Sequence, residues 1–165
     1  MKVVANSSVL IALSTIGQLS LLLRRFPEGV LIPQAVWREV VEAGKGQSGS
    51  KEVASASWII VHEARDKDLV SLLRTEIDEG EAEAIALARE EQASVVLLDE
   101  KNARQAARRL NLKVLGTVGI LIWAKRTGTI VSLQEQLDLL QTQGNFHLSR
   151  SVYEEALKAV GEIKR

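Results

Sequence analysis

The sequence has no cysteine, two prolines, two histidines and few aromatic residues. The absence of cysteine excludes disulfides, zinc–thiolate sites, thiol catalysis and iron–sulfur ligation. It suits a reducing, cytoplasmic compartment. The only candidate histidines for a histidine-based metal site or a Ser-His-Asp triad are His62 and His147. Neither lies in a recognisable motif, so both are interpreted as surface or strand-end residues.

Net charge and long apolar runs are also missing. Lys plus Arg and Asp plus Glu both number 21, so polyanion binding requires a local cluster of basic side chains. The start of the chain has no apolar core of a signal peptide leading to a cleavage site. No uncharged apolar run approaches the roughly 20 residues that span a bilayer. We therefore expect no membrane partner.

The composition that is present favours a globular α/β protein. The 165 residues are 46% hydrophobic and 25% charged, which predicts one domain over residues 1–165 with an ordinary core. Short β-branched runs predict strands, and each is separated from the next by helical patterns. Strands that alternate with helices imply βαβ units, a parallel sheet and strand ends on one rim. The predicted strands are residues 3–5, 30–32, 58–61, 95–98 and 113–115.

Helices are expected between these strands and after the last one. Pro33 is suited to open a helix that Gly44 ends, and residues 45–50 are read as a loop. Ser132 is expected to cap one helix, and Ser149 or Ser151 the final one. The predicted helical segments are residues 9–23, 33–43, 66–75, 82–91, 101–110, 120–126 and 132–140, and a C-terminal segment that contains residues 152–160.

The run Val95-Val96-Leu97-Leu98 leads directly into Asp99 and Glu100. Its length and β-branched content predict a strand buried on both faces, in the interior of the sheet. Ligands of open α/β sheets bind beyond the carboxyl ends of the strands, where Asp99 would stand. The sequence equally allows Asp99 to be the N-cap of the helix that follows it.

Other polar residues are expected at the same rim. Asn6 follows the first strand, Glu39 lies in the helix after the second, and Glu81 begins the helix before the Asp99 strand. Oxygen ligands without histidine or cysteine favour Mg²⁺ or Mn²⁺. Glu81 and Glu79 are also well placed to stabilise a helix dipole, so spacing alone leaves both interpretations open.

Phosphate-binding candidates flank these acids. Arg104 and Arg108 share one face of the helix after Asp99, with Arg109 beside them, and they suit either a phosphate backbone or a solvated helix face. Ser7 and Ser8 suit either phosphate or a helix cap. A nucleotide-binding α/β protein is poorly supported, because neither a GxGxxG nor a GxxxxGK[ST] sequence occurs.

Four segments in order resemble the motifs of the PIN-domain superfamily. They are residues 3–13 (VVANSSVLIAL), 32–40 (IPQAVWREV), 80–88 (GEAEAIALA) and 97–104 (LLDEKNAR). The sequence Gly116-Thr117-Val118-Gly119, with Gly128 after it, is typical of the PIN-like subgroup DUF3368, which is similar to the toxins of VapBC toxin–antitoxin systems. Each motif is weak alone, and the resemblance covers nearly the whole chain.

The resemblance implies a three-layer α/β/α sandwich with a central parallel sheet. It also implies an Mg²⁺- or Mn²⁺-dependent ribonuclease acting on RNA, with a small antitoxin protein as a partner. Glu39, Glu81 and Asp99 match the acidic positions of the family. The resemblance also suggests adjacent or alternate polar positions at Glu83, Glu100 and Thr117.

Asn6 departs from the family pattern, which has aspartate at this position in most nucleases. Asparagine offers a carbonyl oxygen but no charge, so metal affinity should fall. This leaves two hypotheses, a nuclease and a PIN-like module that binds RNA or a protein without cutting. Trp123, Val152, Tyr153 and Leu157 are read as core, with a homodimer contact as the alternative.

Overall fold

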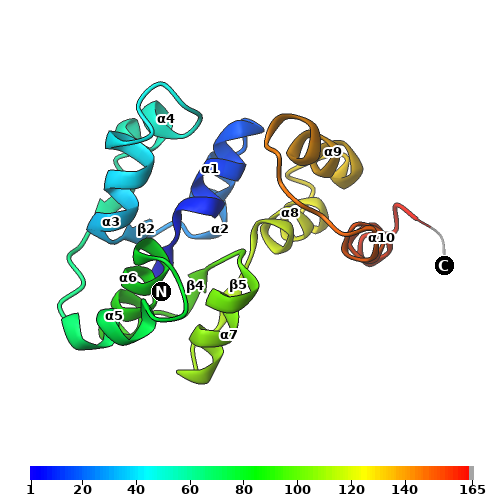
Figure 1. Ribbon diagram of the computed structural model, residues 1–165. Helices are drawn as coiled ribbons and strands as arrows, with labels where there is room; N and C mark the ends of the chain where they lie inside the picture. Colours follow the sequence, from blue (N-terminus) through cyan, green and yellow to red (C-terminus); the bar gives the residue numbers. More distant parts are fainter. Residues whose placement is uncertain (164–165) are drawn as a thin grey trace.

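The computed structural model describes residues 1–163, which form a five-stranded sheet covered by helices on both faces (Figure 1). All strand pairs are parallel, and the strand order is β3-β2-β1-β4-β5. The strands are β1 Val3–Ala5, β2 Val30–Ile32, β3 Ile59–Val61, β4 Val95–Leu97 and β5 Val114–Leu115. The predicted α/β/α sandwich is therefore confirmed. β4 is interior and β3 is an edge strand, as the sequence indicates.

The helices divide between the two faces of the sheet. One face packs against α5 Lys67–Leu73, α6 Glu79–Glu90 and α7 Lys101–Arg109. The elements whose apolar residues pack on the other face are α1 Ser7–Thr15, α2 Ser20–Arg25, α3 Gln34–Trp37, the π-helical turn η1 Arg38–Glu42, α4 Ser50–Ser55, α8 Thr117–Arg126, α9 Leu133–Gln143 and α10 Arg150–Ala159.

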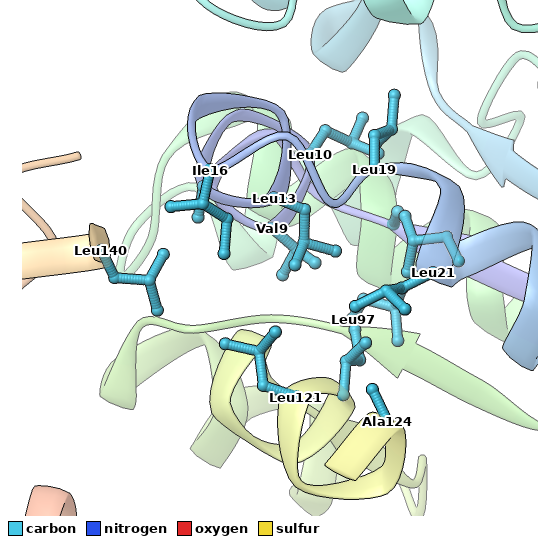
Figure 2. Packing of buried hydrophobic residues seen from close by; sticks show 14 of the residues in the cluster. Val9, Leu10, Leu13, Ile16, Leu19, Leu21, Leu97, Leu121, Ala124 and Leu140 are labelled. Carbon is cyan, nitrogen blue, oxygen red and sulfur yellow. The ribbon is translucent and has the colours of Figure 1, made fainter. Parts of the chain in front are cut away.

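Alternating strand residues supply two cores. Val3 and Ala5 join the core beneath α1 and α8, whereas Val4 joins the core beneath α6 and α7. Figure 2 shows the first core, in which Leu13 of α1 and Leu121 of α8 pack around Leu97. Each fully buried side chain of this kind contributes about 1.5–3 kcal/mol. Because helices cover both faces of the sheet, the strand sequences are continuously apolar and do not alternate between apolar and polar residues.

The C-terminal aromatic and apolar residues mostly belong to the first core. Leu157 is fully buried, and Trp123 and Tyr153 pack partly buried against the same cluster. Their interpretation as core residues is confirmed. Val152 differs, since 47% of its surface is exposed.

Four helix starts differ from the sequence-based prediction. α4 was not predicted; it is six residues long, with Val53 as its only buried apolar residue, so it carries almost no periodic signal. Gly49 precedes it at φ +97°, a left-handed conformation that favours glycine. α1 begins at Ser7, two residues early, and α6 at Glu79 and α8 at Thr117 each begin three residues early. Polar residues fill these first turns, so the apolar pattern starts late.

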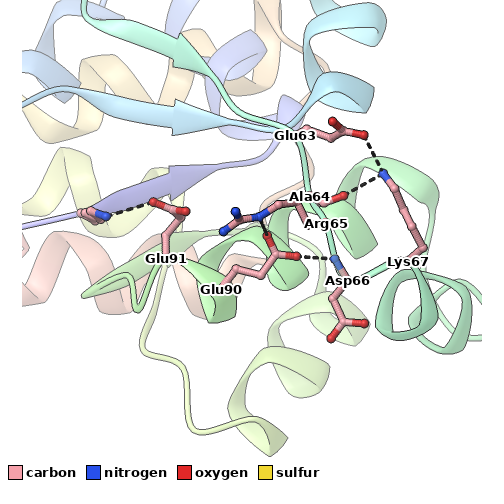
Figure 3. Close-up of polar contacts among 8 residues, drawn as sticks. Glu63, Ala64, Arg65, Asp66, Lys67, Glu90 and Glu91 are labelled. Atoms are coloured by element: carbon pink, nitrogen blue, oxygen red, sulfur yellow. Dashed lines mark hydrogen bonds and ion pairs between the residues drawn. The ribbon is translucent and has the colours of Figure 1, made fainter.

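Polar contacts tie the start of α5 to the end of α6 (Figure 3). The Asp66 N–H donates to Glu90 Oε1 at 2.6 Å, and Lys67 Nζ donates to the Ala64 carbonyl at 2.7 Å. Lys2 Nζ, before β1, donates to Glu91 Oε1 at 3.0 Å. The C-terminal end of α6 is thus held at the amino edge of the sheet. α6 runs about 18 Å, so its first turn reaches the carboxyl rim.

Across residues 1–163, no helix has both the length and the apolar character needed to cross a membrane.

Candidate functional site

A cleft of about 980 Å³ opens at the carboxyl rim of the sheet, where β1 and β4 end side by side. Most of its polar lining comes from the segment after β1, from η1, from the start of α6 and from the start of α7; Asn145 and His147 lie on the segment between α9 and α10. The polar residues of the first group are Asn6, Ser7, Ser8, Glu39, Asp78, Glu81, Asp99, Glu100, Lys101 and Arg104. The structure therefore brings Asn6, Glu39, Glu81 and Asp99 together, as the sequence predicts.

Three polar side chains at the start of α1 lack hydrogen-bond partners. Asn6 is 5% exposed, its backbone N–H donates to the Leu97 carbonyl at 3.1 Å, and its side chain does not cap α1. Asn6 Oδ1 and the hydroxyls of Ser7 and Ser8 are buried without a partner. The capping interpretation of the two serines is therefore wrong. Such buried, unsatisfied atoms are unfavourable unless a ligand or water completes them.

Oxygen atoms from three elements surround the space beside Gly80. A Cβ atom on Gly80 would lie 3.3 Å from both Asn6 Oδ1 and Glu39 Oε2, and 3.6 Å from Asp78 Oδ1. Glycine at this position of α6 leaves the space open. The oxygen atoms form a small cradle, the Gly80 cradle, whose chemistry is that of a hard cation site.

Glu81 is both a helix cap and a cleft residue. Its Oε1 accepts from the Asp78 N–H at 3.1 Å, and its own N–H donates to Asp78 Oδ1 at 2.8 Å. This capping box confirms the capping interpretation of Glu81. The pKa of Glu81 is raised to about 7, chiefly by burial; the hydrogen bond from the Asp78 N–H lowers it in part, and the carboxylates of Asp78 and Glu100 add to the rise.

Glu39 is exposed at the mouth of the cleft, yet partial burial of its carboxyl group raises its pKa. The Ser7 hydroxyl lies close enough to lower this pKa somewhat, although no hydrogen bond of standard length joins the two. The Asp78 carboxylate acts in the opposite direction and raises it. Acids with raised pKa values in one cleft are the arrangement that a bound cation would stabilise in the ionised form.

Thr117 holds the carboxylate of Asp99 in place. The Thr117 N–H donates to Asp99 Oδ1 and the Thr117 hydroxyl donates to Asp99 Oδ2, both at 2.8 Å. Burial raises the pKa of Asp99, and the two Thr117 hydrogen bonds lower it in part. Asp99 therefore accepts from the first residue of α8 and does not cap α7, where Glu100 occupies the N-cap position.

Basic side chains lie beside Asp99. A Cβ on Gly116 would be 2.9 Å from Asp99 Oδ1 and 3.0 Å from Arg104 Nη1, so the two groups converge on one point. Within residues 1–163, neither Arg104 nor Lys101 has a carboxylate within 4.0 Å. Arg108 is exposed and lies outside the cleft lining.

Two of the alternate positions, Glu83 and Thr117, do not themselves line the open cleft. Glu83 Oε1 accepts from the Ala35 N–H at 3.2 Å, at the start of α3, and Glu83 does not line the cleft. Thr117 is fully buried behind Asp99. Glu100, in contrast, is exposed and lines the cleft.

The sequence-based prediction missed several cleft residues. Asp78 was recognisable, because Asp78 and Glu81 have capping-box spacing. Lys101 follows Glu100 and precedes Arg104 by three residues, so its position in the sequence also identified it as a cleft candidate. Residues 144–148 and Val152 gave no sequence signal, because only the packing of α9 and α10 brings them to the cleft.

The residues at the rim fit a hard divalent cation, although they do not form a ready-made site. In the part of the chain that the structure describes, no group of three or more Asp, Glu or His side chains is arranged to hold an ion. The unpartnered Asn6 Oδ1 and the Gly80 cradle nevertheless supply oxygen donors. Asn6, Glu39, Glu81 and Asp99 are the residues that would hold the ion.

The model of the family DUF3368, described as a PIN domain, matches residues 2–162. No curated protein and no solved structure matches the chain.

Proposed function

Because this chain belongs to the DUF3368 family of PIN domains, we propose that it is a divalent-metal-dependent endoribonuclease. The PIN domain is a nuclease-type fold, and PIN domains generally use divalent metals and bind RNA. The observation that carries the proposal is the convergence of Asn6 Oδ1, Glu39, Glu81 and Asp99 in one cleft. Mg²⁺ or Mn²⁺, when bound, supplies Lewis-acid activation of water and neutralises charge on the phosphodiester.

The chain's own residues supply positioning and proton transfer. Glu39, at the mouth of the cleft, is placed to accept the proton of the attacking water. Thr117 fixes the orientation of the Asp99 carboxylate. Arg104 and the unpartnered Ser7 hydroxyl are positioned to bind phosphate oxygens, and Arg108 lies farther along the same helix.

A second candidate function is a PIN-like module that binds RNA or a protein without cutting. Two observations favour it. Asn6 contributes no negative charge to an ion, and both oxygens of Asp99 already accept hydrogen bonds from Thr117, which leaves fewer free acceptor positions on Asp99. Metal binding distinguishes the two candidates, since the binding module has no need of an ion.

The family relationship also leads us to propose a toxin-like role in a type II toxin–antitoxin system. In that case a small antitoxin protein covers the cleft and blocks the acids. Val152, apolar, exposed and on the cleft wall, is a suitable contact for such a partner or for a second copy of the chain.

Cleavage of RNA tests the nuclease proposal directly. Wild-type protein with Mn²⁺ is expected to cleave members of a panel of structured and single-stranded RNAs, and Asp99→Asn should reduce the rate at least 100-fold. Glu83→Gln is the matched control, because Glu83 binds the start of α3 outside the cleft, and it should retain activity. Equal cleavage by the wild type and Asp99→Asn, or none across the panel, contradicts the proposal.

Calorimetric titration with Mn²⁺ provides a readout independent of activity. Gly80→Ala places a methyl group in the Gly80 cradle and should weaken Mn²⁺ binding about tenfold or more. The Asn6 and Glu39 side chains must shift by a few tenths of an ångström to admit the methyl group, whereas alanine has the higher helix propensity. A urea midpoint close to that of the wild type shows that the variant is folded. No Mn²⁺ binding by the wild type at millimolar concentration favours the binding module.

A further inference from the structure

One side of the cleft continues onto a basic face of α7. Lys101, Arg104 and Arg108 recur at helical spacing and lie on one face, which we term the α7 basic ridge. The opposite face is made of Ala103, Ala106 and Ala107, which are buried against the sheet. α7 contains no acidic residue, so nothing on the helix itself neutralises the ridge.

Ion pairing separates this ridge from an ordinary solvated helix face. Arg109, the neighbour of Arg108, pairs with Glu76 at 2.8 Å. The three ridge residues have no such partner within 4.0 Å in residues 1–163. Lys101 and Arg104 also face the cleft. The ridge therefore carries cations without an ion-pair partner within 4.0 Å from the cleft, where Arg104 lies beside Asp99, to Arg108 on the surface. A row of cations of this kind suits a bound chain of phosphates.

The far side of the cleft has a different chemistry. It is formed by residues 144–148, which join α9 to α10, and by Val152. In Figure 1 this segment, in orange, runs from α9 past α8 to α10, and α6 lies on the other side of α1. It contributes the ring of Phe146, which is half-buried and packs in part against the first core, and the exposed side chain of Val152. Two exposed polar residues, Asn145 and His147, belong to the same segment. We term residues 144–148 and Val152 the apolar wall, after Phe146, Leu148 and Val152.

Hydrogen bonds hold the apolar wall in place. The Phe146 N–H donates to the Leu140 carbonyl at 3.0 Å, and Gln141 Nε2 donates to the Leu148 carbonyl at 3.5 Å. The Glu162 carboxylate accepts from the N–H groups of Leu133 and Gln134, which ties the chain after α10 to the start of α9. The wall is thus hydrogen-bonded to α9, and α10 is tied to the start of the same helix.

We propose that single-stranded RNA binds in one orientation, with its sugar–phosphate backbone along the α7 basic ridge and its bases against the apolar wall. This inference rests on the proposed RNA-directed function. Unpaired bases expose faces that stack on aromatic rings, and phosphates need cations, so the two sides of the cleft match the two sides of a single strand. A duplex keeps its bases paired and cannot present them to Phe146 and His147.

Salt dependence of binding tests the backbone side. The Asp99→Asn protein, which should not cleave, is titrated with a fluorescent 12-nucleotide single-stranded RNA at 50–200 mM salt. The plot of log affinity against log salt has a negative slope. Lys101→Gln and Arg108→Gln, made singly, should each make this slope less negative by about 0.7. Arg109→Gln is the control on the same helix and should leave the slope unchanged, because Arg109 is paired with Glu76.

An abasic oligomer of the same length tests the base side. Phe146→Leu combined with His147→Ala should weaken binding of the RNA about fivefold or more and leave binding of the abasic oligomer unchanged. His62→Ala is the control, since His62 does not line the cleft. Urea midpoints close to that of the parent protein show that each variant is folded.

The outcomes separate this inference from the proposed function. No binding of any RNA by the parent protein overturns both. RNA binding with unchanged salt slopes for the ridge variants, or with equal losses on RNA and abasic oligomer for the wall variants, overturns the orientation alone. Tighter binding of the matching duplex also overturns it.

Discussion

Glu81 combines a structural role with a strongly perturbed carboxyl group. Its pKa of about 7, raised by burial, exceeds the ordinary value of 4.5. Between these pH values the folded state holds a proton that the unfolded chain has released. The free energy of unfolding should therefore fall as the pH rises from about 4.5 to 7.

The Glu81→Gln variant tests this dependence in EDTA. Glutamine keeps an oxygen for the Asp78 N–H but does not titrate. Relative to the variant, the wild type should lose on the order of 2–3 kcal/mol of stability across this range. Urea unfolding at pH 4.5, 5.5, 6.5 and 7.5 measures it. Parallel curves for the two proteins would contradict the assignment.

Thr117 is a positioning residue for Asp99. Thr117→Val removes the hydroxyl bound to Asp99 Oδ2 and retains the backbone N–H bound to Oδ1. We expect a loss of about 1–3 kcal/mol in unfolding free energy, because a buried carboxylate oxygen is left unpaired. Thr117→Ser should restore most of it. Thr142→Val, which removes an exposed hydroxyl, should change stability by less than about 0.5 kcal/mol.

At the scale of elements, Glu162 caps a helix from outside it. Its carboxylate accepts from the Leu133 N–H at 2.6 Å and the Gln134 N–H at 3.0 Å, at the start of α9, and lies 3.5 Å from Lys125 Nζ. Burial alone would raise the pKa of Glu162, but the two N–H donors and Lys125 together lower it. The contact is therefore stabilising while the carboxylate is ionised.

Glu162→Ala should cost about 1–2 kcal/mol at pH 7, as loss of a helix cap does. Because the folded-state pKa is lowered, this contribution is present above the ordinary glutamate pKa and is lost as the pH falls through the folded value. Urea unfolding at pH 7 and pH 3 should show the difference shrinking in acid. Glu155→Ala, at an exposed position of α10, should have little effect at either pH; a comparable loss there would contradict the capping role.

For the whole molecule, the two cores share one sheet. Val3 and Val4 are neighbours in β1 yet face opposite cores, so loss of one core exposes the strands of the other. We expect one cooperative unfolding transition for residues 1–165, with far-UV and tryptophan signals coincident. Two separated transitions would show independent units.

Mn²⁺ at 100 times its dissociation constant should raise the free energy of unfolding by about 2.7 kcal/mol. Asp99→Asn should reduce this increment while still unfolding in one step. An equal increment in both proteins would place the ion away from the cleft. Differential scanning calorimetry with EDTA as reference measures the increment.

The sequence determined the strands, their parallel arrangement and the rim at which the acids meet. These follow from local patterns: apolar runs of strand length, helical periodicity between them, and the rule that parallel strands end on one side. The order of the acids along the chain was sufficient to place Asn6, Glu39, Glu81 and Asp99 in one cleft.

Only the tertiary structure decided how those residues are used. Glu83 and Glu81 are two residues apart, but one binds the start of α3 and the other lines the cleft. Asp99 is held by Thr117, 18 positions along the chain, and not by its own helix. The apolar wall at residues 144–148 depends on the packing of α9 and α10. Such contacts join segments distant in sequence, so no local pattern encodes them.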